Sequence, residues 1–511
     1  MPSLGEAFAR TAAQRDGAVA LLFDDTAYTY RELAARAAAT AQALVERGVR
    51  RGDRVAVGLA NSPELATTIW GVIQAGAVLV PLNPAYTADE LLYIVSDSGS
   101  RIAVVEAQHA AVLAQASPPD LSLIVSAPAT LAPEPHMAAA PPASGSQPSL
   151  EADAPALIVY TSGTTGRPKG AVLSHAALLT NLTTVAQAWA WTEADRLLLT
   201  LPCFHLHGLG LGLIASFLIG SSVVLRPRFV AEDVGADLER SRATMFFGVP
   251  TMYNRLVALP DTALTGCDLH RMRLWVSGSA PLSAATFERF RQRFGSVIVE
   301  RFGMTECGFV LSTPYAGVRR PGVVGVPLPG IVVRIVDPDA ADAGRLVDVP
   351  DGTQGEILIR GPNLFSGYWN RPAETARALL DGYLRSGDWA VRESDGMVRI
   401  VGRSSVDIIK TRGFKVSAVE VEHCLQRHPQ VQEVAVVGIP DVDQGERIVA
   451  AVTPLAGSTL TADMLHAFAR QHLAPHKTPA RFVFMDEIPR IGPGKFKKKE
   501  LIARLQDLPA A

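Results

Sequence analysis

Hydrophobic and polar residues follow two different periods along the chain. Residues 54–59 form a short apolar run typical of a buried strand, residues 64–75 have helical spacing, and residues 77–81 again resemble a strand. A succession of strand, helix and strand is typical of parallel sheets whose faces are covered by helices. The pattern therefore predicts an α/β fold in which a large N-terminal domain contains sheets of the parallel type.

The pattern changes character near residue 400. Strand-like runs at 355–360 and 397–401 give way to a closer alternation of helical segments at 418–427 and 462–472 with strands at 433–438 and 448–452. Such a mixture is typical of a small α+β unit. We therefore expect an N-terminal domain over residues 1–402 and a small, mobile C-terminal domain over residues 403–511.

Composition limits the classes of protein that fit. With 511 residues, the chain is long enough for roughly two to four domains of about 100–200 residues each. Its 48% hydrophobic and 19% charged residues fit a globular protein with sizeable cores. A formal net charge of −2 provides no global attraction to nucleic acid or to anionic membranes. We therefore expect small-molecule partners and no nucleic-acid or membrane partner, while the oligomeric state stays open.

Cysteine usage and the N-terminus indicate the compartment. The 4 cysteines lie far apart without a CxxC pair, which argues against a disulfide framework or a structural zinc site and suits a reducing compartment. No unbroken run of about 18 apolar residues is long enough to span a bilayer. Arg10 and Arg15 resemble the basic positions of a transit peptide, but Glu6 and Asp16 argue against one. These observations predict a cytoplasmic protein.

The strongest local motif is a loop at residues 160–170, YTSGTTGRPKG, between two apolar strand-like runs. Its glycines let backbone N–H groups approach phosphate oxygens, its hydroxyls add donors, and Lys169 adds a positive charge. The loop is not a Walker A motif, because Gly163 and Gly166 are three positions apart and Gly170 follows the lysine. The motif favours a polyphosphate site other than that of P-loop NTPases, with an ordinary surface loop as the alternative.

The loop resembles the phosphate loop of the adenylate-forming superfamily, which includes acyl-CoA synthetases, adenylation domains of peptide synthetases and luciferases. Further segments of the family pattern follow in the same order, namely 204–208 (FHLHG), 278–281 (GSAP), 301–306 (RFGMTE), 383–388 (YLRSGD), 402–403 (GR) with 410–414 (KTRGF), and 489–495 (PRIGPGK). The resemblance covers essentially the whole chain. It implies an ATP-dependent acid–thiol ligase that forms an acyl-adenylate and transfers the acyl group to coenzyme A.

The resemblance assigns roles for the first half-reaction, in which a carboxylate attacks the α-phosphate of ATP. Glu306 is expected to bind Mg²⁺, and Thr305 to donate to the α-phosphate. Lys495 is expected to be the catalytic lysine, whose ammonium offsets charge in the transition state. Asp388 is expected to accept hydrogen bonds from the ribose hydroxyls. The remaining expected ATP-binding residues are Thr161, Ser162, Gly163, Thr164, Thr165, Gly166, Lys169, Gly278, Ser279, Ala280, Pro281, Phe302, Gly303, Met304 and Arg403.

Taken without the resemblance, several of these residues have ordinary interpretations. Thr305 and Glu306 would be a helix cap or an exposed pair, and Asp388 would be a turn residue. The charge run at 497–499, which follows Lys495, is predicted to be a solvated surface. Only Lys495 is set apart from that run, because Gly492 and Gly494 precede it.

The resemblance also implies a second half-reaction, in which the thiol of coenzyme A attacks the adenylate after the small domain has rotated. Ser405 is the expected hinge, although many relatives carry Asp or Lys there. The expected CoA-binding residues are Lys410, Arg412, Gly413 and Phe414. Gly413 would let pantetheine pass close to the backbone, and Arg412 stands where relatives often have glycine.

The acid site is expected among residues 202–208, the GSAP segment and RFGMTE, with His205 as its gating residue. Arg301 adds a guanidinium that could hold a second carboxylate by paired hydrogen bonds, and His207 and Ser277 are further candidate contacts. Together with residues 405–411 and 415–422, this combination resembles the malonyl-CoA synthetases. It implies malonate as the acid, with methylmalonate as a second candidate.

Other functions stay open at this stage. Arg301 could instead pair with Glu300 on the surface, leaving a pocket for a short or aromatic monocarboxylic acid. An adenylation domain that loads a carrier protein is a further alternative. A catalytically silent ATP- or acyl-binding protein is disfavoured, because such a protein would be expected to lose Lys169, Glu306 or Lys495. A metal site at His205 and His207 is disfavoured because no third ligand is evident.

Overall fold

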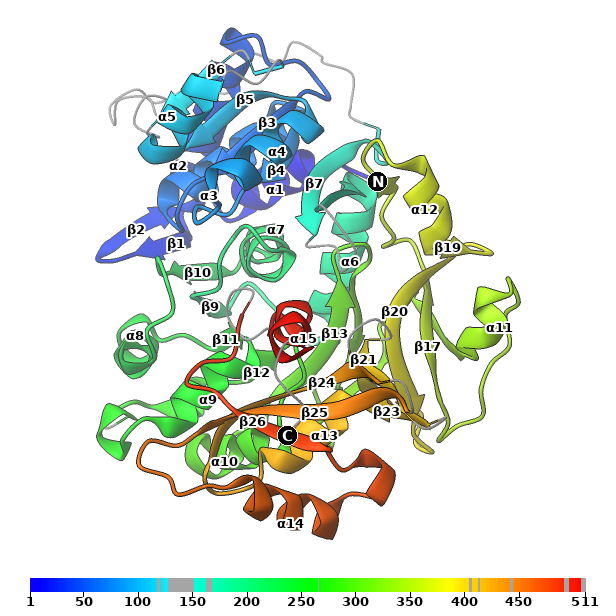
Figure 1. Ribbon diagram of the computed structural model, residues 1–511. Helices are drawn as coiled ribbons and strands as arrows, with labels where there is room; N and C mark the ends of the chain where they lie inside the picture. The colour runs from blue at the N-terminus through cyan, green and yellow to red at the C-terminus, as the bar shows by residue number, and fades with distance from the viewer. Residues whose placement is uncertain are drawn as a thin grey trace.

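The computed structural model describes residues 1–116, 120–121, 123–126, 151–161, 168–264, 266–403, 407–411, 414–441, 444–490 and 496–506. Three sheets organise these residues (Figure 1). In the view of Figure 1 the blue elements lie at the top, the green ones in the middle and the orange ones at the bottom, whereas the red C-terminal helix lies near the centre. The predicted α/β architecture, with a large N-terminal part and a smaller C-terminal part, is confirmed.

The seven-stranded sheet contains the strand–helix–strand pattern that opened the sequence. Its strands, in spatial order, are β18 (Gly367–Tyr368), β8 (Lys169–Ser174), β7 (Pro155–Thr161), β4 (Val78–Pro81), β3 (Arg54–Gly58), β5 (Ser100–Val105) and β6 (Leu123–Ser126). β3 pairs in parallel with β4, as predicted, and also with β5. The connecting helix α3 (Pro63–Gln74) begins sharply because the Ser62 side chain accepts from the Leu65 N–H and Pro63 occupies its first turn.

The fourteen-stranded sheet combines a run of parallel strands with antiparallel strands. Its strands, in spatial order, are β16 (Val332–Val336), β17 (Gln354–Arg360), β20 (Tyr383–Arg392), β21 (Val398–Arg403), β15 (Val323–Pro327), β14 (Gly308–Ser312), β13 (Val299–Met304), β12 (Leu274–Ser277), β11 (Met245–Gly248), β9 (Arg196–Leu199), β10 (Ser222–Leu225), β1 (Val19–Phe23) and β2 (Thr26–Thr29), with β19 (Leu379–Leu380) beside β20. The strands from β13 to β1 are parallel. Ligands of such sheets bind beyond the carboxyl ends of the strands, where Ser277 ends β12.

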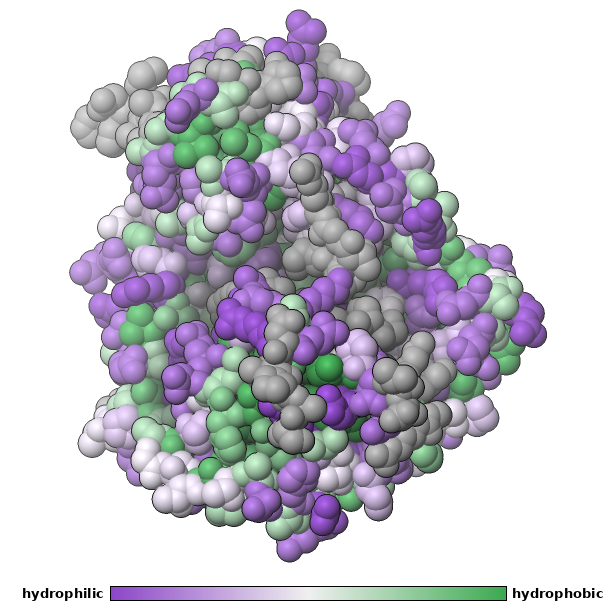
Figure 2. Space-filling view, in the orientation of Figure 1, coloured by the Kyte–Doolittle hydropathy of each residue, from purple (hydrophilic) through white to green (hydrophobic). Residues whose placement is uncertain are grey.

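Helices cover the first two sheets, as the sequence predicts for parallel strands. They are α1 (Leu4–Gln14), α2 (Tyr30–Glu46), α3, α4 (Ala88–Ser98), α5 (Ala107–Ala116), α6 (His175–Ala188), α7 (Ala215–Ile219), α8 (Val234–Ser241), α9 (Pro250–Ala258), α10 (Ala284–Phe294), α11 (Pro338–Asp342) and α12 (Pro372–Ala378). Within the described part of the chain, no helix has both the length and the apolar character of a membrane span. On the face drawn in Figure 2, hydrophilic residues predominate and hydrophobic ones form small separate groups.

The C-terminal elements form a third sheet with cores of its own. Its strands are β23 (Phe414–Ser417), β22 (Ile408–Thr411), β25 (Gly445–Pro454), β24 (Val431–Asp441) and β26 (Arg481–Phe484). Alternate residues of β24 point to opposite faces: Val436 packs in a cluster with α13 (Ala418–Leu425) and α14 (Ala462–His472), and Val437 in a cluster with α15 (Lys498–Gln506). The helices and strands expected in this region are thereby confirmed.

Candidate active site

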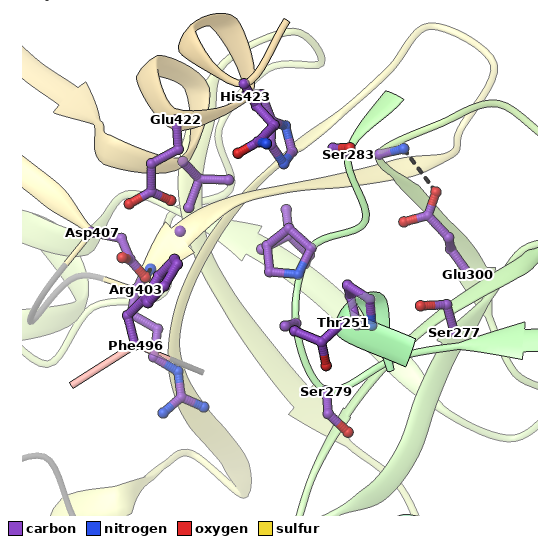
Figure 3. Close-up of a pocket in the computed structure, with 18 of the residues that line it drawn as sticks. Thr251, Ser277, Ser279, Ser283, Glu300, Arg403, Asp407, Glu422, His423 and Phe496 are labelled. Carbon is purple, nitrogen blue, oxygen red and sulfur yellow. Dashed lines mark hydrogen bonds between the residues drawn. The ribbon is translucent and has the colours of Figure 1, made fainter. Parts of the chain in front are cut away.

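A pocket of about 300 Å³ lies between the carboxyl end of the parallel strands and the C-terminal elements. It brings together nine of the residues expected from the sequence: Ser277, Ser279, Ala280, Pro281, Arg301, Phe302, Gly303, Asp388 and Arg403. Figure 3 shows Ser277 and Ser279 on one side of the pocket and Arg403 with Asp407 on the other. Side chains from β12, β13, β20 and β21 therefore converge with α13 of the third sheet.

Arg301 is a buried cation on β13. Arg301 is only 5% exposed. Its guanidinium carbon lies 4.7 Å from the centre of the Phe309 ring, and its Nη2 has a long 3.5 Å contact with Ser279 Oγ. No carboxylate forms an ion pair with it among the residues that the structure describes, and its Nε has no hydrogen-bond acceptor there. Burial lowers the pKa of Arg301 to about 9. Such a group is costly unless an anion joins it.

The alternative in which Arg301 pairs with Glu300 on the surface is wrong. Glu300 is buried, and its Oε1 accepts a 2.8 Å hydrogen bond from the Gly322 N–H, the dashed line in Figure 3. Successive residues of a strand point to opposite faces, so these two neighbours diverge. Gly278 explains how the guanidinium fits, because a Cβ at that position would lie 2.4 Å from its Cζ. Burial raises the pKa of Glu300 to about 8, although hydrogen bonds from backbone N–H groups act to lower it.

His207 and Ser277 add further unsatisfied polar atoms. Both ring nitrogens of His207 and the hydroxyl of Ser277 are buried and have no hydrogen-bond partner in the described residues. Burial, followed by the neighbouring charges of Arg301 and His205, holds the pKa of His207 well below its usual value. Since buried polar groups are nearly always hydrogen-bonded, this concentration around one guanidinium points to a ligand. His205 is exposed, with its ring 4.3 Å from that of Phe204.

His207 is the first residue of a glycine-rich π-helix, η2, which determines the position of the His207 ring. The helix spans His207–Ile214. Gly208 is required because a Cβ there would lie 2.3 Å from the Pro202 carbonyl oxygen. The His207 ring stacks on Phe247, with centroids 6.3 Å apart. Wide helical turns of this kind are frequent at functional sites.

Asp388 and Arg403 lie opposite each other because β20 and β21 pair in antiparallel register. The Arg403 Nε donates to Asp388 Oδ1 at 3.0 Å. The negative charge of Asp388 is the main cause that raises the pKa of Arg403. A buried carboxylate held by a guanidinium in the pocket wall is suited to accept hydrogen bonds from a diol, as expected for the ribose.

Residues 279–281 form another part of the pocket wall. Ser279 has a positive φ of 71°, which non-glycine residues rarely adopt. Gly303, in the facing strand, is required because a Cβ would lie 2.1 Å from the Gly308 carbonyl oxygen. Strained or crowded backbone of this kind is typical of ligand sites.

Glu306 belongs to a second group of contacts near the phosphate loop. Its Oε1 accepts a 2.8 Å hydrogen bond from the Tyr368 hydroxyl, and the Lys169 ammonium lies 5.0 Å from the centre of the Tyr368 ring. Pairing of β18 with β8 brings Tyr368 beside the strand that Lys169 begins. Tyr368 was not predicted from the sequence, because only this pairing shows its two contacts.

A magnesium ion fits this arrangement. Mg²⁺ prefers oxygen and is usually held by one or two carboxylates together with phosphates and water. The buried Glu306 carboxylate, fixed by Tyr368, is a donor of that type. Within the described residues no group of three or more His, Cys, Asp or Glu could hold a metal by itself. The ion would therefore complete its ligand set from the substrate.

The remaining expected residues are distributed as follows. Thr161 and Lys169 pair across the base of the phosphate loop, with the Thr161 hydroxyl 3.4 Å from the Lys169 carbonyl oxygen. Phe414 is 51% exposed and stacks on His476, while Lys410 lies in β22. Met304 and Thr305 are half-buried beside Glu306. Outside the described residues lie Ser162, Gly163, Thr164, Thr165, Gly166, Ser405, Arg412, Gly413 and Lys495.

The prediction of a solvated charge run at 497–499 is wrong at its middle residue. Lys497 and Lys499 are exposed, but Lys498 is only 8% exposed. Its ammonium forms ion pairs with Asp407 and Glu422. Asp407 immediately precedes β22 and Glu422 lies on α13, so the sequence around Lys498 carried no sign of either partner.

Comparison with known proteins defines the class. The family model of AMP-binding enzymes matches residues 8–369, and that of the AMP-binding enzyme C-terminal domain matches residues 420–495. The chain belongs to the AMP-binding enzyme family.

Individual relatives show which enzymes of this family the chain is similar to. The chain is 37% identical to the mitochondrial malonate–CoA ligase ACSF3 of Mus musculus, over 94% of this chain and 87% of that protein. It is 36% identical to a feruloyl-CoA synthase of Streptomyces sp, over 98% of this chain and 99% of the relative. Among solved structures, ATP-bound MatB from Rhodopseudomonas palustris has a TM-score of 0.89 and 34% identity, over 98% of this chain and 99% of that one. The last match confirms the expected fold over nearly the whole chain.

Proposed function

We propose that this protein is an AMP-forming malonate–CoA ligase, with methylmalonate as a second substrate, and that it acts in the cytoplasm. The observation that carries the proposal is the buried Arg301, which lacks a carboxylate partner among the described residues while polar atoms of His207 and Ser277 are unsatisfied nearby. A dicarboxylic acid would supply the missing anion with its far carboxylate. Its near carboxylate would then face the nucleotide side of the same pocket.

The proposed reaction has two steps. A carboxylate oxygen of malonate attacks the α-phosphorus of ATP, and the bond to pyrophosphate breaks. The thiolate of coenzyme A then attacks the carbonyl carbon of the adenylate, and AMP leaves. Both reactants of the first step are anions, so cations and aligned donors must offset their repulsion.

The residues divide between these tasks. Asp388 and Arg403 would hold the ribose, Lys169 and the phosphate loop the polyphosphate, and Glu306 a magnesium ion that offsets phosphate charge. Lys495 would stabilise the transition state of the first step. In the second step, rotation of the small domain about Ser405 would bring the CoA-binding segment, residues 410–414, to the adenylate.

A monocarboxylate–CoA ligase is the alternative, favoured by the similarity to a feruloyl-CoA synthase. The rings of Phe247 and Phe309 beside His207 would suit an aromatic acid. Against it, a neutral ring would leave the Arg301 guanidinium buried without an anion, at a cost of several kcal/mol.

The test is CoA-thioester formation with ATP, Mg²⁺ and a panel of acetate, butyrate, benzoate, 4-coumarate, ferulate, malonate, methylmalonate and succinate. We expect malonate to lead by more than about tenfold in kcat/KM, which corresponds to about 1.4 kcal/mol. If an aromatic acid leads instead, the dicarboxylate assignment is overturned while the ligase assignment stands. If none of these acids gives a thioester or releases pyrophosphate, the ligase assignment fails.

A further inference from the structure

Lys498 is a buried lysine in a charge run that otherwise faces solvent. Its Nζ lies 2.5 Å from Asp407 Oδ1 and 2.6 Å from Glu422 Oε1. Burial by itself would lower the pKa of Lys498, but the two carboxylates outweigh it and raise that pKa. The ammonium is therefore charged in the folded protein and is held by two ion pairs.

Asp407 connects this lysine with the nucleotide side of the pocket. Its second oxygen, Oδ2, accepts a 3.0 Å hydrogen bond from the Arg403 N–H, and its own N–H donates to the Arg403 carbonyl oxygen at 2.8 Å. Arg403 in turn donates to Asp388 at 3.0 Å. Figure 3 shows Asp407 beside Arg403, with Glu422 above them. A continuous path of contacts therefore leads from Lys498 to the carboxylate proposed to bind ribose.

The pKa values of the two carboxylates are shifted in opposite directions. Burial raises the pKa of Asp407, but Lys498 and the donors from Arg403 outweigh it, so that this pKa lies below its usual value. The pKa of Glu422 is raised by burial in spite of the same lysine. The two ion pairs are alike in length, and Asp407 is the partner that also contacts Arg403. Without Lys498, the Asp407 carboxylate would be buried without a cation facing its Oδ1.

We infer that Lys498 is a positioning residue of the nucleotide site: through Asp407 it fixes Arg403, and thereby the orientation of Asp388. The inference rests on the proposed ligase function. Arg403 and Asp407 flank the proposed hinge at Ser405, so their mutual hydrogen bonds join the two sides of that hinge in the arrangement described here. Lys498 therefore supports the adenylation step and not the transfer to coenzyme A.

The decisive variant is Lys498→Met, which keeps the length of the side chain and removes its charge. We expect the KM for ATP in pyrophosphate release to rise about tenfold or more, equivalent to at least about 1.4 kcal/mol, with the KM for malonate within about twofold of wild type. Formation of malonyl-CoA from supplied malonyl-adenylate should stay within about twofold. Assays are run below the unfolding transition of each variant.

The charge run at 497–499 supplies two matched controls. Lys497→Met and Lys499→Met remove equal charges at exposed positions and should leave both half-reactions unchanged. Lys498→Arg, which keeps the charge, should restore part of the ATP affinity. If Lys498 had a purely structural role, Lys498→Met would slow both half-reactions and weaken the binding of ATP and malonate alike. That outcome would overturn the inference.

Asp407→Asn provides an independent test should Lys498→Met fail to fold. Asparagine keeps an acceptor for the Arg403 N–H but loses the charge that Lys498 holds. We expect the same selective rise in the KM for ATP, and an unchanged KM would contradict the inference. Failure of the proposed function is recognised separately, because wild type would then not turn over malonate; the ATP comparison is repeated with whichever acid wild type activates.

Discussion

Two groups of buried charge border the same pocket, and they are satisfied in opposite ways. Arg301 has no carboxylate partner in the described residues, and its neighbours His207 and Ser277 are also unsatisfied. Lys498, by contrast, is held between Asp407 and Glu422. A protein interior tolerates an unpaired charge when a bound ligand supplies the opposite charge. A charge that is paired within the protein instead holds its partner side chains in place. The difference separates a binding group from a positioning group.

The largest effect on stability is expected at the paired group. Lys498→Met leaves two largely buried carboxylates, 16% and 15% exposed, without their cation. The free energy of unfolding should therefore fall by about 3–5 kcal/mol. Urea denaturation followed by circular dichroism measures the loss. Lys499→Met, on the exposed neighbour, should change stability by no more than about 0.5 kcal/mol. Equal stability of the two variants would remove the distinction between the groups.

The unpaired group should respond in the opposite direction. Arg301→Met removes a buried cation that has no internal partner among the described residues, so the melting temperature of the free protein should rise. The kcat/KM for malonate should fall roughly 10- to 150-fold, since a hydrogen bond to a charged group contributes about 1.5–3 kcal/mol. The KM for ATP should not change. A thermal shift assay adds a direct readout, because malonate should raise the melting temperature of wild type only. Unaltered malonate kinetics would refute the proposed contact.

The buried Glu300 tests the comparison through pH. Burial raises its pKa from the ordinary 4.5 to about 8, so its ionised form is disfavoured in the folded state. Its contribution to stability is complete below the unfolded-state pKa and is lost as the pH rises through about 8. Wild type should therefore lose stability between these two pH values, by about 1.4 kcal/mol for each pH unit, and Glu300→Gln should not. Parallel stability–pH curves for the two proteins would show that Glu300 does not titrate in this range.

Local pattern was sufficient for much of the fold and for part of the site. The apolar run at residues 54–59 and the capping sequence Ser62–Pro63 specify a strand and a helix start by themselves. Asp388 and Arg403 were each expected in the ATP site from their motifs, and the structure places them opposite each other on adjacent strands.

The errors and omissions share a different cause. Lys498 meets a carboxylate 91 positions away, and Tyr368 meets one 62 positions away. Glu300 does not pair with Arg301, because its carboxylate accepts a hydrogen bond from the Gly322 N–H instead. Tertiary partners of this kind decide whether a charge is solvated, paired or available to a ligand, and no local period or composition contains that information.

Tyr368 is expected to show the smallest effect, because it contacts both a candidate metal ligand and a candidate phosphate-binding lysine without carrying charge itself. Tyr368→Phe keeps the ring beside Lys169 and removes the hydrogen bond to Glu306. The Mg²⁺ concentration for half-maximal pyrophosphate release should rise about fivefold, as a loss of about 1 kcal/mol predicts. ATP binding by equilibrium dialysis without Mg²⁺ should be unchanged. If ATP binding without the metal weakens equally, Tyr368 acts through Lys169 and not through Glu306.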